Sequence, residues 1–352
     1  MKPLDLASVE PHPAAADAFV HIDDLRVRFV SREATVRAVN GVSFDLERGQ
    51  VLCIIGESGS GKSVMMRSLL RLHPKKRTVI EGVMKVGEHN IANVSERTMS
   101  ELRGATISMI FQEPMTALDP LYTIGDQIAE TVMRHEKIDR QAAWARALEL
   151  LELVRVPSPE RRLKAFPHEL SGGLRQRAMI AVALSCRPSL LLADEPTTAL
   201  DASVQIQVLV LLRRLQQEMG MSMIFVTHDL GVAAQIADKV AVMYAGRIIE
   251  YGEARDILLA PQHPYTKAML TSTIKDQVRG KRLEAIPGTP PDLRMLPDGC
   301  SFAPRCSHAT PECMVAVPAA VSDAGGHMVR CIKVSAPGGQ LVSDVKHDAP
   351  LA

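Results

Sequence analysis

A glycine-rich loop near the start of the chain lies between an apolar segment and a helix-favouring one. Residues 51–55 are continuously apolar, which predicts a buried strand, and residues 63–72 favour a helix. The loop between them has the spacing Gly, four residues, Gly-Lys-Ser, and reads Gly56-Glu57-Ser58-Gly59-Ser60-Gly61-Lys62-Ser63. Glycines let consecutive backbone N–H groups converge on phosphate oxygens, and the helix points the positive end of its dipole at the same anion. The loop therefore predicts a nucleotide site in which Lys62 reaches the β- and γ-phosphates and Ser63 binds Mg²⁺.

Two carboxylates follow a second apolar segment. Residues 189–193 read Ser-Leu-Leu-Leu-Ala, and Asp194 and Glu195 come directly after them. In proteins with this kind of phosphate-binding loop, an aspartate at such a strand end holds Mg²⁺. We therefore expect Asp194 to hold Mg²⁺ and Glu195 to polarise the water that attacks the γ-phosphate. An acidic strand end alone is equally well explained as a structural feature, so this interpretation depends on the glycine-rich loop upstream.

Strands alternate with helices along most of the chain, which predicts an α/β domain with a mostly parallel sheet. Alternating apolar residues at about 19–47 indicate antiparallel strands. Helices are expected at about 125–155, 172–186 and 204–219, and a further buried strand at 223–227. Residues 283–338 are dense in Pro, Gly and Cys and have little periodic apolar sequence. We therefore expect a loop-rich segment with little apolar core of its own.

Composition argues against several classes of protein. The net charge is +1 and aromatic residues make up only 3% of the chain, which argues against a nucleic-acid partner. No apolar run approaches the ~18–20 residues that a membrane helix needs. Residues 1–13 lack the basic and apolar regions of a secretory signal. We expect a protein that is soluble by itself and cytoplasmic.

Residues 170–177 carry the most specific pattern in the chain. They read Leu-Ser-Gly-Gly-Leu-Arg-Gln-Arg, with Ser171, Gly172 and Gly173 near the start. This segment resembles the signature of ABC transporter ATPases, although Leu174 replaces the consensus Gln. In that family two subunits dimerise head to tail, and the signature of one closes on the γ-phosphate bound by the other; a serine hydroxyl and a glycine-rich helix N-terminus suit that task. The resemblance implies ATP hydrolysis and a P-loop NTPase fold of ABC ATPase type, with a mixed sheet core, an antiparallel β subdomain and a helical subdomain.

Other positions match further motifs of the same family. Gln112 resembles the Q-loop glutamine, which contacts Mg²⁺ and water. Asp201 ends an Ala-Leu-Asp segment that resembles the D-loop, and His228 resembles the switch histidine that contacts the γ-phosphate. Phe29 is expected to stack on adenine, against the alternative that it is a core residue of a strand. Val64 directly follows the phosphate loop and completes the expected ATP contacts.

Two segments after residue 250 resemble the peptide-permease branch of the family. These are His263-Pro264-Tyr265-Thr266 and Gly299-Cys300-Ser301-Phe302-Ala303-Pro304-Arg305-Cys306. Residues 174–180 are more similar to the D-type ATPase than to its F-type partner. The resemblance implies import of dipeptides or oligopeptides by a complex with an F-type ATPase subunit, two transmembrane permease subunits and an extracytoplasmic substrate-binding protein. It also implies a peripheral position at the cytoplasmic face of the inner membrane.

Other substrates stay open, because this kind of ATPase subunit does not touch the solute. Nickel chelates, glutathione and other peptide-like solutes are the alternatives within transport. A soluble ABC ATPase acting on ribosomes or DNA is a less favoured class, since the chain has one phosphate loop, one signature and no sustained heptads. The expected organisation is a flexible leader at 1–18, an ATPase domain at 19–265 with a helical subdomain at about 115–186, an appendage at 266–334 and a disordered tail at 335–352.

Four cysteines crowd into the appendage, at Cys300, Cys306, Cys313 and Cys331. Disulfides are not expected in a cytoplasmic ATPase. Most zinc ribbons contain a Cys-x-x-Cys pair, which is missing here, whereas an iron–sulfur cluster needs four thiolates without so strict a spacing. The resemblance implies a [4Fe-4S] cluster at these cysteines; Zn²⁺ and unliganded thiols are the alternatives. We expect the metal to stabilise the appendage rather than to perform redox chemistry.

Overall fold

The computed structural model describes residues 18–198, 200–274 and 286–334. The tail expected at 335–352, and the leader expected at 1–18 except Ala18, lie outside the described residues. Among the described helices, none combines the length and apolar character needed to cross a membrane.

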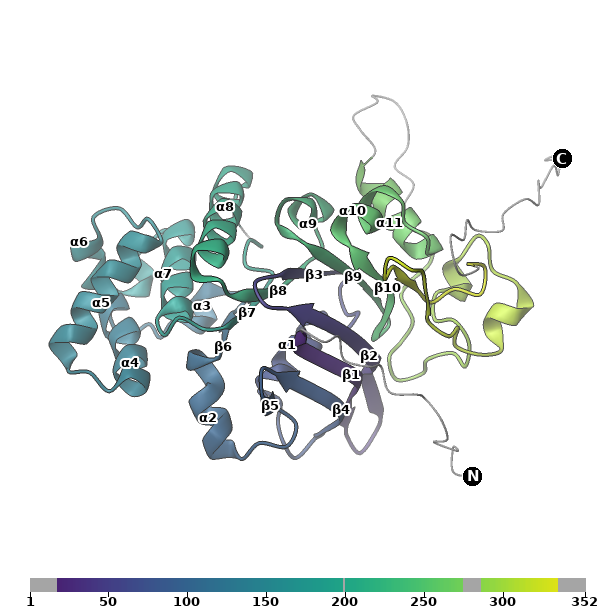
Figure 1. Ribbon diagram of the computed structural model, residues 1–352, viewed down its shortest axis with the longest axis horizontal. Coiled ribbons are helices and arrows are strands. Elements are labelled where there is room, and N and C mark those ends of the chain that lie inside the picture. The colour runs from purple at the N-terminus through teal and green to yellow at the C-terminus, as the bar shows by residue number, and fades with distance from the viewer. Residues whose placement is uncertain (1–17, 199, 275–285, 335–352) are drawn as a thin grey trace.

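An eight-stranded mixed sheet forms the centre of the molecule (Figure 1). The five strands from β9 to β6 pair in parallel, and β10, β12 and β11 extend the sheet with antiparallel pairings. In spatial order the strands are β11 (Val321–Ser322), β12 (Met328–Val329), β10 (Arg247–Glu253), β9 (Lys239–Tyr244), β3 (Val51–Ile55), β8 (Ser222–Thr227), β7 (Leu190–Asp194) and β6 (Ile107–Ile110). Strands β3, β7 and β8 are buried along their whole length, as expected for strands covered on both faces. The predicted parallel sheet is therefore confirmed.

A second, antiparallel sheet packs beside the first. Its order is β2 (Thr35–Glu47), β1 (Ala18–Val30), β4 (Thr78–Val86) and β5 (His89–Asn90). Helix α1 (Lys62–Leu69) contacts strands of both sheets, and Met65, Met66 and Leu69 bury their side chains in the core between them. This packing holds the start of α1, and the glycine-rich loop before it, next to the carboxyl end of the central strand β3.

Most of the remaining helices gather in two places. One group lies at one end of the molecule: α2 (Glu96–Ala105), α3 (Pro114–Ala117), α4 (Ile124–Glu136), α5 (Arg140–Leu153), α6 (Pro159–Leu163), the 3₁₀ turn η1 (Pro167–Glu169) and α7 (Gly172–Leu184). The other covers one face of the large sheet: α8 (Ala202–Met219), α9 (Leu230–Ile236), α10 (Ala254–Leu259) and α11 (Pro264–Ile274). Residues 125–155 are mostly helical, as predicted, but they form two helices. Helix α4 stops where Lys137 adopts a left-handed φ of 55°, and Asp139 caps α5 by accepting from Ala142 N–H at 2.8 Å.

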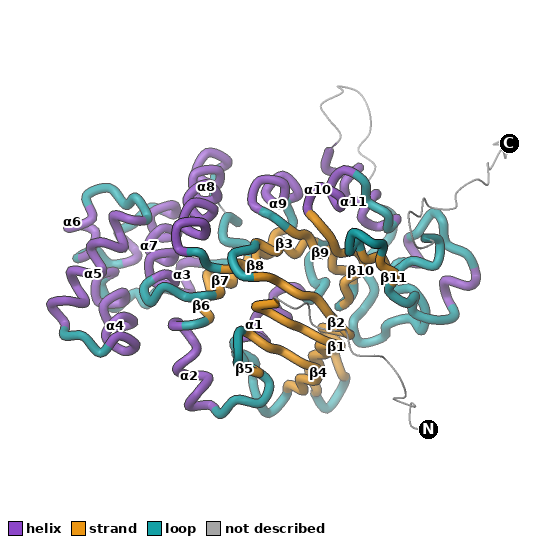
Figure 2. The backbone as a smooth tube through the Cα atoms, in the orientation of Figure 1, coloured by secondary structure: helices purple, strands orange, loops and turns teal. Residues whose placement is uncertain are grey.

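Residues 286–334 are mostly loop, as predicted (Figure 2). They contain two 3₁₀ turns, η2 (Ala303–Arg305) and η3 (Pro311–Met314), besides β11 and β12. The segment has little apolar core of its own, as expected, but one of its aromatic side chains packs into the preceding domain. Phe302 is buried, with its ring centroid 5.4 Å from that of Tyr244 and 5.3 Å from that of Tyr265. The segment therefore shares the core of the preceding domain instead of relying on a core of its own.

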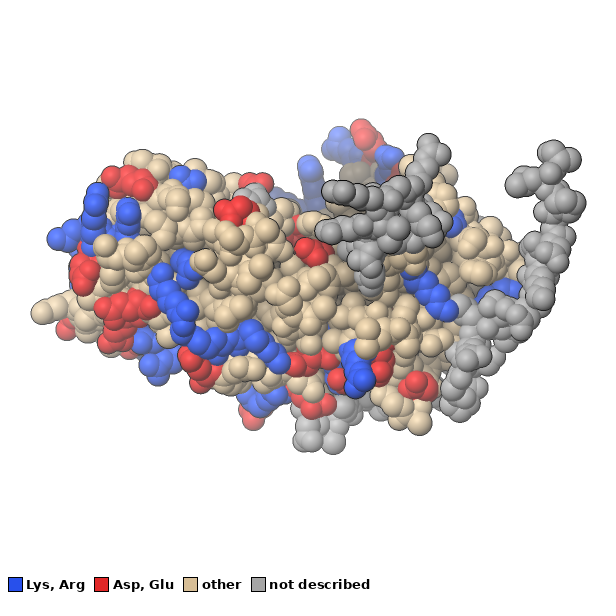
Figure 3. Space-filling model, turned by 90° about the horizontal axis from the view of Figure 1, so that it is seen from above, with Lys and Arg blue, Asp and Glu red and all other residues tan. Residues whose placement is uncertain are grey.

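Acidic and basic side chains occur together on the face shown in Figure 3, as expected from the small net charge.

Candidate active site

The glycine-rich loop joins β3 to α1, as the sequence predicts. Two of its glycines are required by the backbone. Gly56 has a φ of 151°, and a Cβ there would overlap the Met243 carbonyl. Gly61 has a φ of 102°, and a Cβ would overlap the Ala38 carbonyl. These close approaches on β9 and β2 force the loop to curve tightly around the N-terminus of α1.

Lys62 lies inside the curve of the loop and is only 5% exposed. Its Nζ donates to the carbonyl oxygens of Gly56 and Glu57, both at 2.8 Å. Burial lowers the pKa of the ammonium, while the charges of Glu195, Asp194 and Glu57 oppose that shift. The side chain is thus a buried cation held by carbonyl groups that a phosphate oxygen could replace.

Asp194, the last residue of β7, is fully buried beside α1. Its Oδ1 accepts from Ser63 Oγ at 2.7 Å, and the guanidinium of Arg67 lies 3.7 Å from Oδ2. Burial raises the pKa of this carboxyl, while the bond from Ser63 and the Arg67 charge act in the opposite direction. Oδ2 has no hydrogen-bond partner among the described residues. A hydroxyl paired with a carboxylate that keeps one oxygen unused fits a Mg²⁺ ion or its bound water.

Glu195 follows in a strained backbone conformation, with a φ of 45°. Its Oε2 accepts from Thr198 Oγ1 at 2.9 Å and lies 3.2 Å from Nδ1 of His228. Gln112 Nε2 also donates to Oε2, at 3.4 Å. The structure therefore brings together the three side chains proposed for hydrolysis, from segments that follow β7, β8 and β6.

Phe29 lies on β1, close to the segment that follows α1. Its half-buried ring meets His73 edge to face, with centroids 5.3 Å apart. His73 Nε2 is in turn 2.9 Å from the carbonyl oxygen of Val64 and 3.1 Å from Ser68 Oγ. Phe29 is thus linked to the first turn of α1 through one side chain.

The signature residues lie apart from the phosphate loop of the same chain, because α7 begins in the helical end of the molecule while α1 is central (Figure 1). Ser171 and Gly172 are exposed, and the Ser171 side chain makes no capping bond to α7. Gly173 faces Val204 of α8, since a Cβ there would come 2.9 Å from Val204 Cγ1. The helix N-terminus is therefore open to an external ligand.

Asp201 has a clear local role as the N-cap of α8. Its Oδ1 accepts from Val204 N–H at 3.0 Å and from Ser203 Oγ at 2.7 Å, and these bonds hold the pKa of the carboxyl low. Ala199, the first residue of the expected D-loop, lies outside the described residues.

The four cysteines of the appendage are free thiols. Burial raises the pKa of Cys300, Cys306 and Cys331, and the neighbouring thiols of the group raise it further, while nearby backbone N–H groups act in the opposite direction. Across the described residues, no three His, Cys, Asp or Glu side chains are grouped so as to hold a metal ion. The arrangement therefore does not support the predicted cluster or its zinc alternative.

Four contacts around the site were not predicted. Arg67 faces Asp194 and Thr198 binds Glu195, as described above. The phenol oxygen of Tyr265 accepts from Glu57 N–H at 3.0 Å, and Arg305 pairs with the Glu57 carboxylate. Tyr265 and Arg305 belong to segments that resemble the peptide-permease branch, but more than 200 positions separate them from the loop. No local pattern reveals such contacts.

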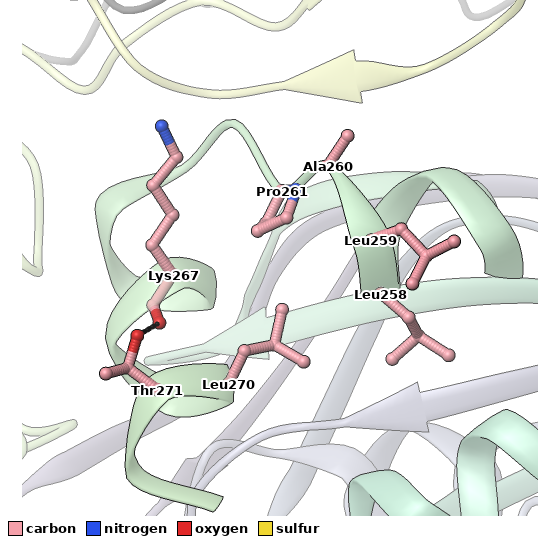
Figure 4. A pocket seen from close by; sticks show the side chains of 7 residues that line it. All are labelled: Leu258, Leu259, Ala260, Pro261, Lys267, Leu270 and Thr271. Carbon is pink, nitrogen blue, oxygen red and sulfur yellow. Dashed lines mark hydrogen bonds between the residues drawn. The ribbon is translucent and has the colours of Figure 1, made fainter. Parts of the chain in front are cut away.

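A separate pocket of about 590 Å³ lies between α10 and α11 (Figure 4). It is lined by Leu258, Leu259, Ala260, Pro261, Lys267, Leu270 and Thr271. Its lining includes a single charged group, the Lys267 ammonium, and no residue of the phosphate loop. It lacks the carboxylates that phosphoryl transfer needs.

Comparison with known proteins agrees with this geometry. Residues 39–198 match the ABC transporter family model, and residues 249–313 match the C-terminal region of oligopeptide/dipeptide transporters. The dipeptide transport ATP-binding protein DppD of Bacillus subtilis is 47% identical over 311 residues, covering 88% of this chain and 93% of that protein. The oligopeptide transport ATP-binding protein OppD of Escherichia coli is 45% identical over 318 residues, covering 90% and 94%.

A solved ATP-binding cassette shares the fold. It is a dimer in a post-hydrolysis state with ADP and phosphate, and it is 27% identical with a TM-score of 0.61, covering 67% of this chain and 99% of that one. The predicted fold class is thereby confirmed. The nearly full-length likeness and the grouping of Lys62, Ser63, Asp194 and Glu195 lead to one conclusion. The chain is an ATP-hydrolysing ATP-binding protein of the ABC transporter family, with an oligopeptide/dipeptide transporter C-terminal region.

Proposed function

We propose that this chain hydrolyses ATP to energise the import of dipeptides or oligopeptides. The observation that carries the proposal is the coexistence, in one chain, of a complete phosphate and carboxylate site and a C-terminal region of oligopeptide/dipeptide transporter type. Relatives with almost the same length are named for dipeptide and oligopeptide transport. Nickel chelates, glutathione and other peptide-like solutes are the competing outcomes of the test below.

ATP binding uses the loop and α1. The backbone N–H groups from Ser58 to Ser63 surround the β- and γ-phosphates, and Lys62 exchanges its bonds to loop carbonyls for bonds to phosphate oxygens. Ser63 and the unused oxygen of Asp194 hold Mg²⁺, with Gln112 nearby. The ion supplies neutralisation of the charge that develops on the transferred phosphoryl group. Phe29 stacks on adenine.

Hydrolysis centres on Glu195. A carboxylate held by Thr198, Gln112 and His228 is oriented before substrate arrives, so it is in place to accept a proton from the attacking water. His228 is 62% exposed and can turn toward the γ-phosphate. The strained φ of Glu195 keeps its carboxylate at the mouth of the site.

The open N-terminus of α7 supports a head-to-tail dimer in which Ser171, Gly172 and Gly173 close on ATP bound by another subunit. We propose that this subunit is an F-type ATPase. Two transmembrane permease subunits dock near Gln112, and an extracytoplasmic binding protein delivers the solute. The chain then lies peripherally at the cytoplasmic face of the inner membrane, and ATP-driven closure shifts the conformational equilibrium of the permease.

We propose residues 19–265 as the ATPase domain, with residues 115–186 as its helical subdomain, and residues 266–334 as the appendage. The buried contacts of Phe302 with Tyr244 and Tyr265 support an appendage that folds onto this domain. Limited proteolysis tests these limits: early cleavage is expected outside residues 19–334, and a first cut inside 19–265 would contradict them.

A [4Fe-4S] cluster, with Zn²⁺ as the alternative, is a separate proposal for the four cysteines. Its support is the family resemblance and the nearness of the four thiols, whose burial and mutual repulsion raise the pKa of Cys300, Cys306 and Cys331 while backbone N–H groups oppose that shift. The described arrangement lacks a grouped ligand set, so binding would require the thiols to draw together. Anaerobic purification with iron, sulfide and zinc assays tests it, with Cys186→Ser as control for Cys306→Ser. Purified protein that contains no iron, no sulfide and no zinc would refute the proposed metal site.

Uptake of labelled peptides by source cells, with and without the gene, tests the proposed function. We expect loss of peptide uptake, restored by the wild-type gene but not by Lys62→Ala. Nickel and glutathione uptake serve as controls. Unchanged peptide uptake with loss of either control solute would overturn the peptide assignment.

A further inference from the structure

Glu57, the second residue of the phosphate loop, is held at three points. Its carbonyl oxygen accepts from Lys62 Nζ at 2.8 Å, within the loop itself. Its N–H donates to the phenol oxygen of Tyr265, on α11, at 3.0 Å. Its carboxylate receives both terminal nitrogens of Arg305, at 2.8 and 3.0 Å. Two of the three supports therefore come from residues beyond 260, outside the segment that forms the nucleotide site.

Arg305 is itself rigidly placed. It ends η2 in the appendage, and its side chain is only 6% exposed. Besides the two bonds to Glu57, Nε donates to the Pro287 carbonyl at 2.8 Å and one terminal nitrogen donates to Tyr244 OH at 3.1 Å. A planar guanidinium with this many fixed partners constrains the direction as well as the distance of the carboxylate it binds.

We propose that Arg305 is a positioning residue for ATP binding, and that through it the appendage sets the affinity of the phosphate loop for nucleotide. The inference rests on the proposed ATP-binding role of the loop and deepens it. Glu57 is adjacent to Gly56, and its carbonyl is one of two that hold Lys62. A shift of Glu57 therefore moves both the backbone N–H groups and the ammonium that meet the phosphates.

Replacing Arg305 should weaken nucleotide binding without unfolding the protein. Removal of Arg305 leaves a partly buried carboxylate without its cation next to the site of a highly charged anion. The unpaired Glu57 carboxylate repels the phosphates. Without Arg305 to hold Glu57, the loop can also change its conformation. We expect ATP to bind about tenfold more weakly to Arg305→Ala, which lies within the range of coupling between contacting residues.

Equilibrium titration of the full-length protein with a fluorescent ATP analogue and Mg²⁺ tests the proposal. Wild type, Arg305→Ala, Arg305→Lys and Glu57→Gln are compared, together with Arg305→Ala in the Glu57→Gln background. Arg294→Ala is the matched control, because Arg294 is an appendage arginine whose guanidinium pairs with Asp292 in its own segment. Thermal unfolding of each variant separates loss of affinity from loss of fold.

We expect the Kd to rise about tenfold in Arg305→Ala, to recover in part in Arg305→Lys and to stay at the wild-type value in Arg294→Ala. Once Glu57 is already Gln, Arg305→Ala should change the Kd less than about twofold, as a coupled pair requires.

Equal Kd values for folded wild type and Arg305→Ala would overturn the proposal. If Arg305→Ala fails to fold, Glu57→Gln decides the question from the other partner: an unchanged Kd in that variant refutes the coupling. Failure of wild type to bind the analogue would instead refute the ATP-binding role of the loop.

Discussion

Glu250, on β10, is fully buried and accepts three hydrogen bonds. Gln262 N–H and His263 N–H donate at 2.6 and 3.1 Å, and Nε2 of His327 lies 2.8 Å from Oε1. The carboxylate thus ties the start of α11 and the turn between β11 and β12 to β10. Replacing Glu250 with Ala removes all three bonds and fills none of the space.

The magnitude follows from these contacts. Each buried donor left without a partner costs about 1–3 kcal/mol, and breaking a buried ion pair from one side costs about 3–5 kcal/mol. The side chain of His327 is only 10% exposed, so water replaces little of what is lost. Because the terms share the same atoms, we expect Glu250→Ala to lower the free energy of unfolding by about 3–5 kcal/mol in total.

Urea unfolding followed by circular dichroism measures this loss, as a lower midpoint with a similar m-value. Glu253→Ala is the matched control on the same strand, since Glu253 is exposed and makes no capping bond to α10; it should change stability by less than about 0.5 kcal/mol. Equal midpoints for Glu250→Ala and Glu253→Ala would refute the reasoning.

Three further predictions concern pH, catalysis and the loop. The bond to Glu250, with the charges of Glu250, Asp323 and Asp256, raises the pKa of His327, while burial opposes this shift. The charge-dependent part of its stabilisation is therefore complete below about pH 6.5 and is lost as the pH rises through the raised pKa. Urea midpoints at pH 5.5 and 8.5 should show that His327→Gln lowers stability more at the lower pH, and equal losses at the two pH values would contradict this. Glu195→Gln should bind ATP normally but hydrolyse it about 10²–10⁴-fold more slowly in a phosphate-release assay, and near-normal turnover would remove Glu195 from its role. Gly61→Ala should abolish ATP binding because its Cβ would overlap the Ala38 carbonyl. Gly49→Ala is the control: Gly49 has a φ of 73° and no neighbour within 4 Å, so this variant should bind ATP normally and lose about 1–2 kcal/mol of stability. ATP binding by Gly61→Ala would contradict the close approach.

The sequence predicts the parts of the site that local pattern encodes. Strand β3 begins and ends at the predicted residues, because a continuous apolar run before a glycine-rich loop has few other interpretations. The sequence also predicts that Ser63 and Asp194 lie on the same side of the sheet, since both follow the carboxyl ends of parallel strands. It does not predict that only β8 separates β3 from β7.

The remaining features depend on contacts between distant segments. The two-residue strands β11 and β12 carry no readable periodicity, and they form only because β10 offers an edge. The bond from Arg305 to Glu57 spans 248 positions. The break between α4 and α5 depends on the left-handed backbone conformation of Lys137, which cannot be predicted from the residue type.

We propose that ATP hydrolysis at Glu195 drives peptide import. The most direct test is accumulation of a labelled dipeptide in proteoliposomes that contain the complete permease and internal ATP, with either wild-type chain or Glu195→Gln. We predict ATP-dependent accumulation with the wild-type chain and almost none with Glu195→Gln, at equal assembly of the complex. Equal accumulation by the two, or accumulation without ATP, would contradict the account.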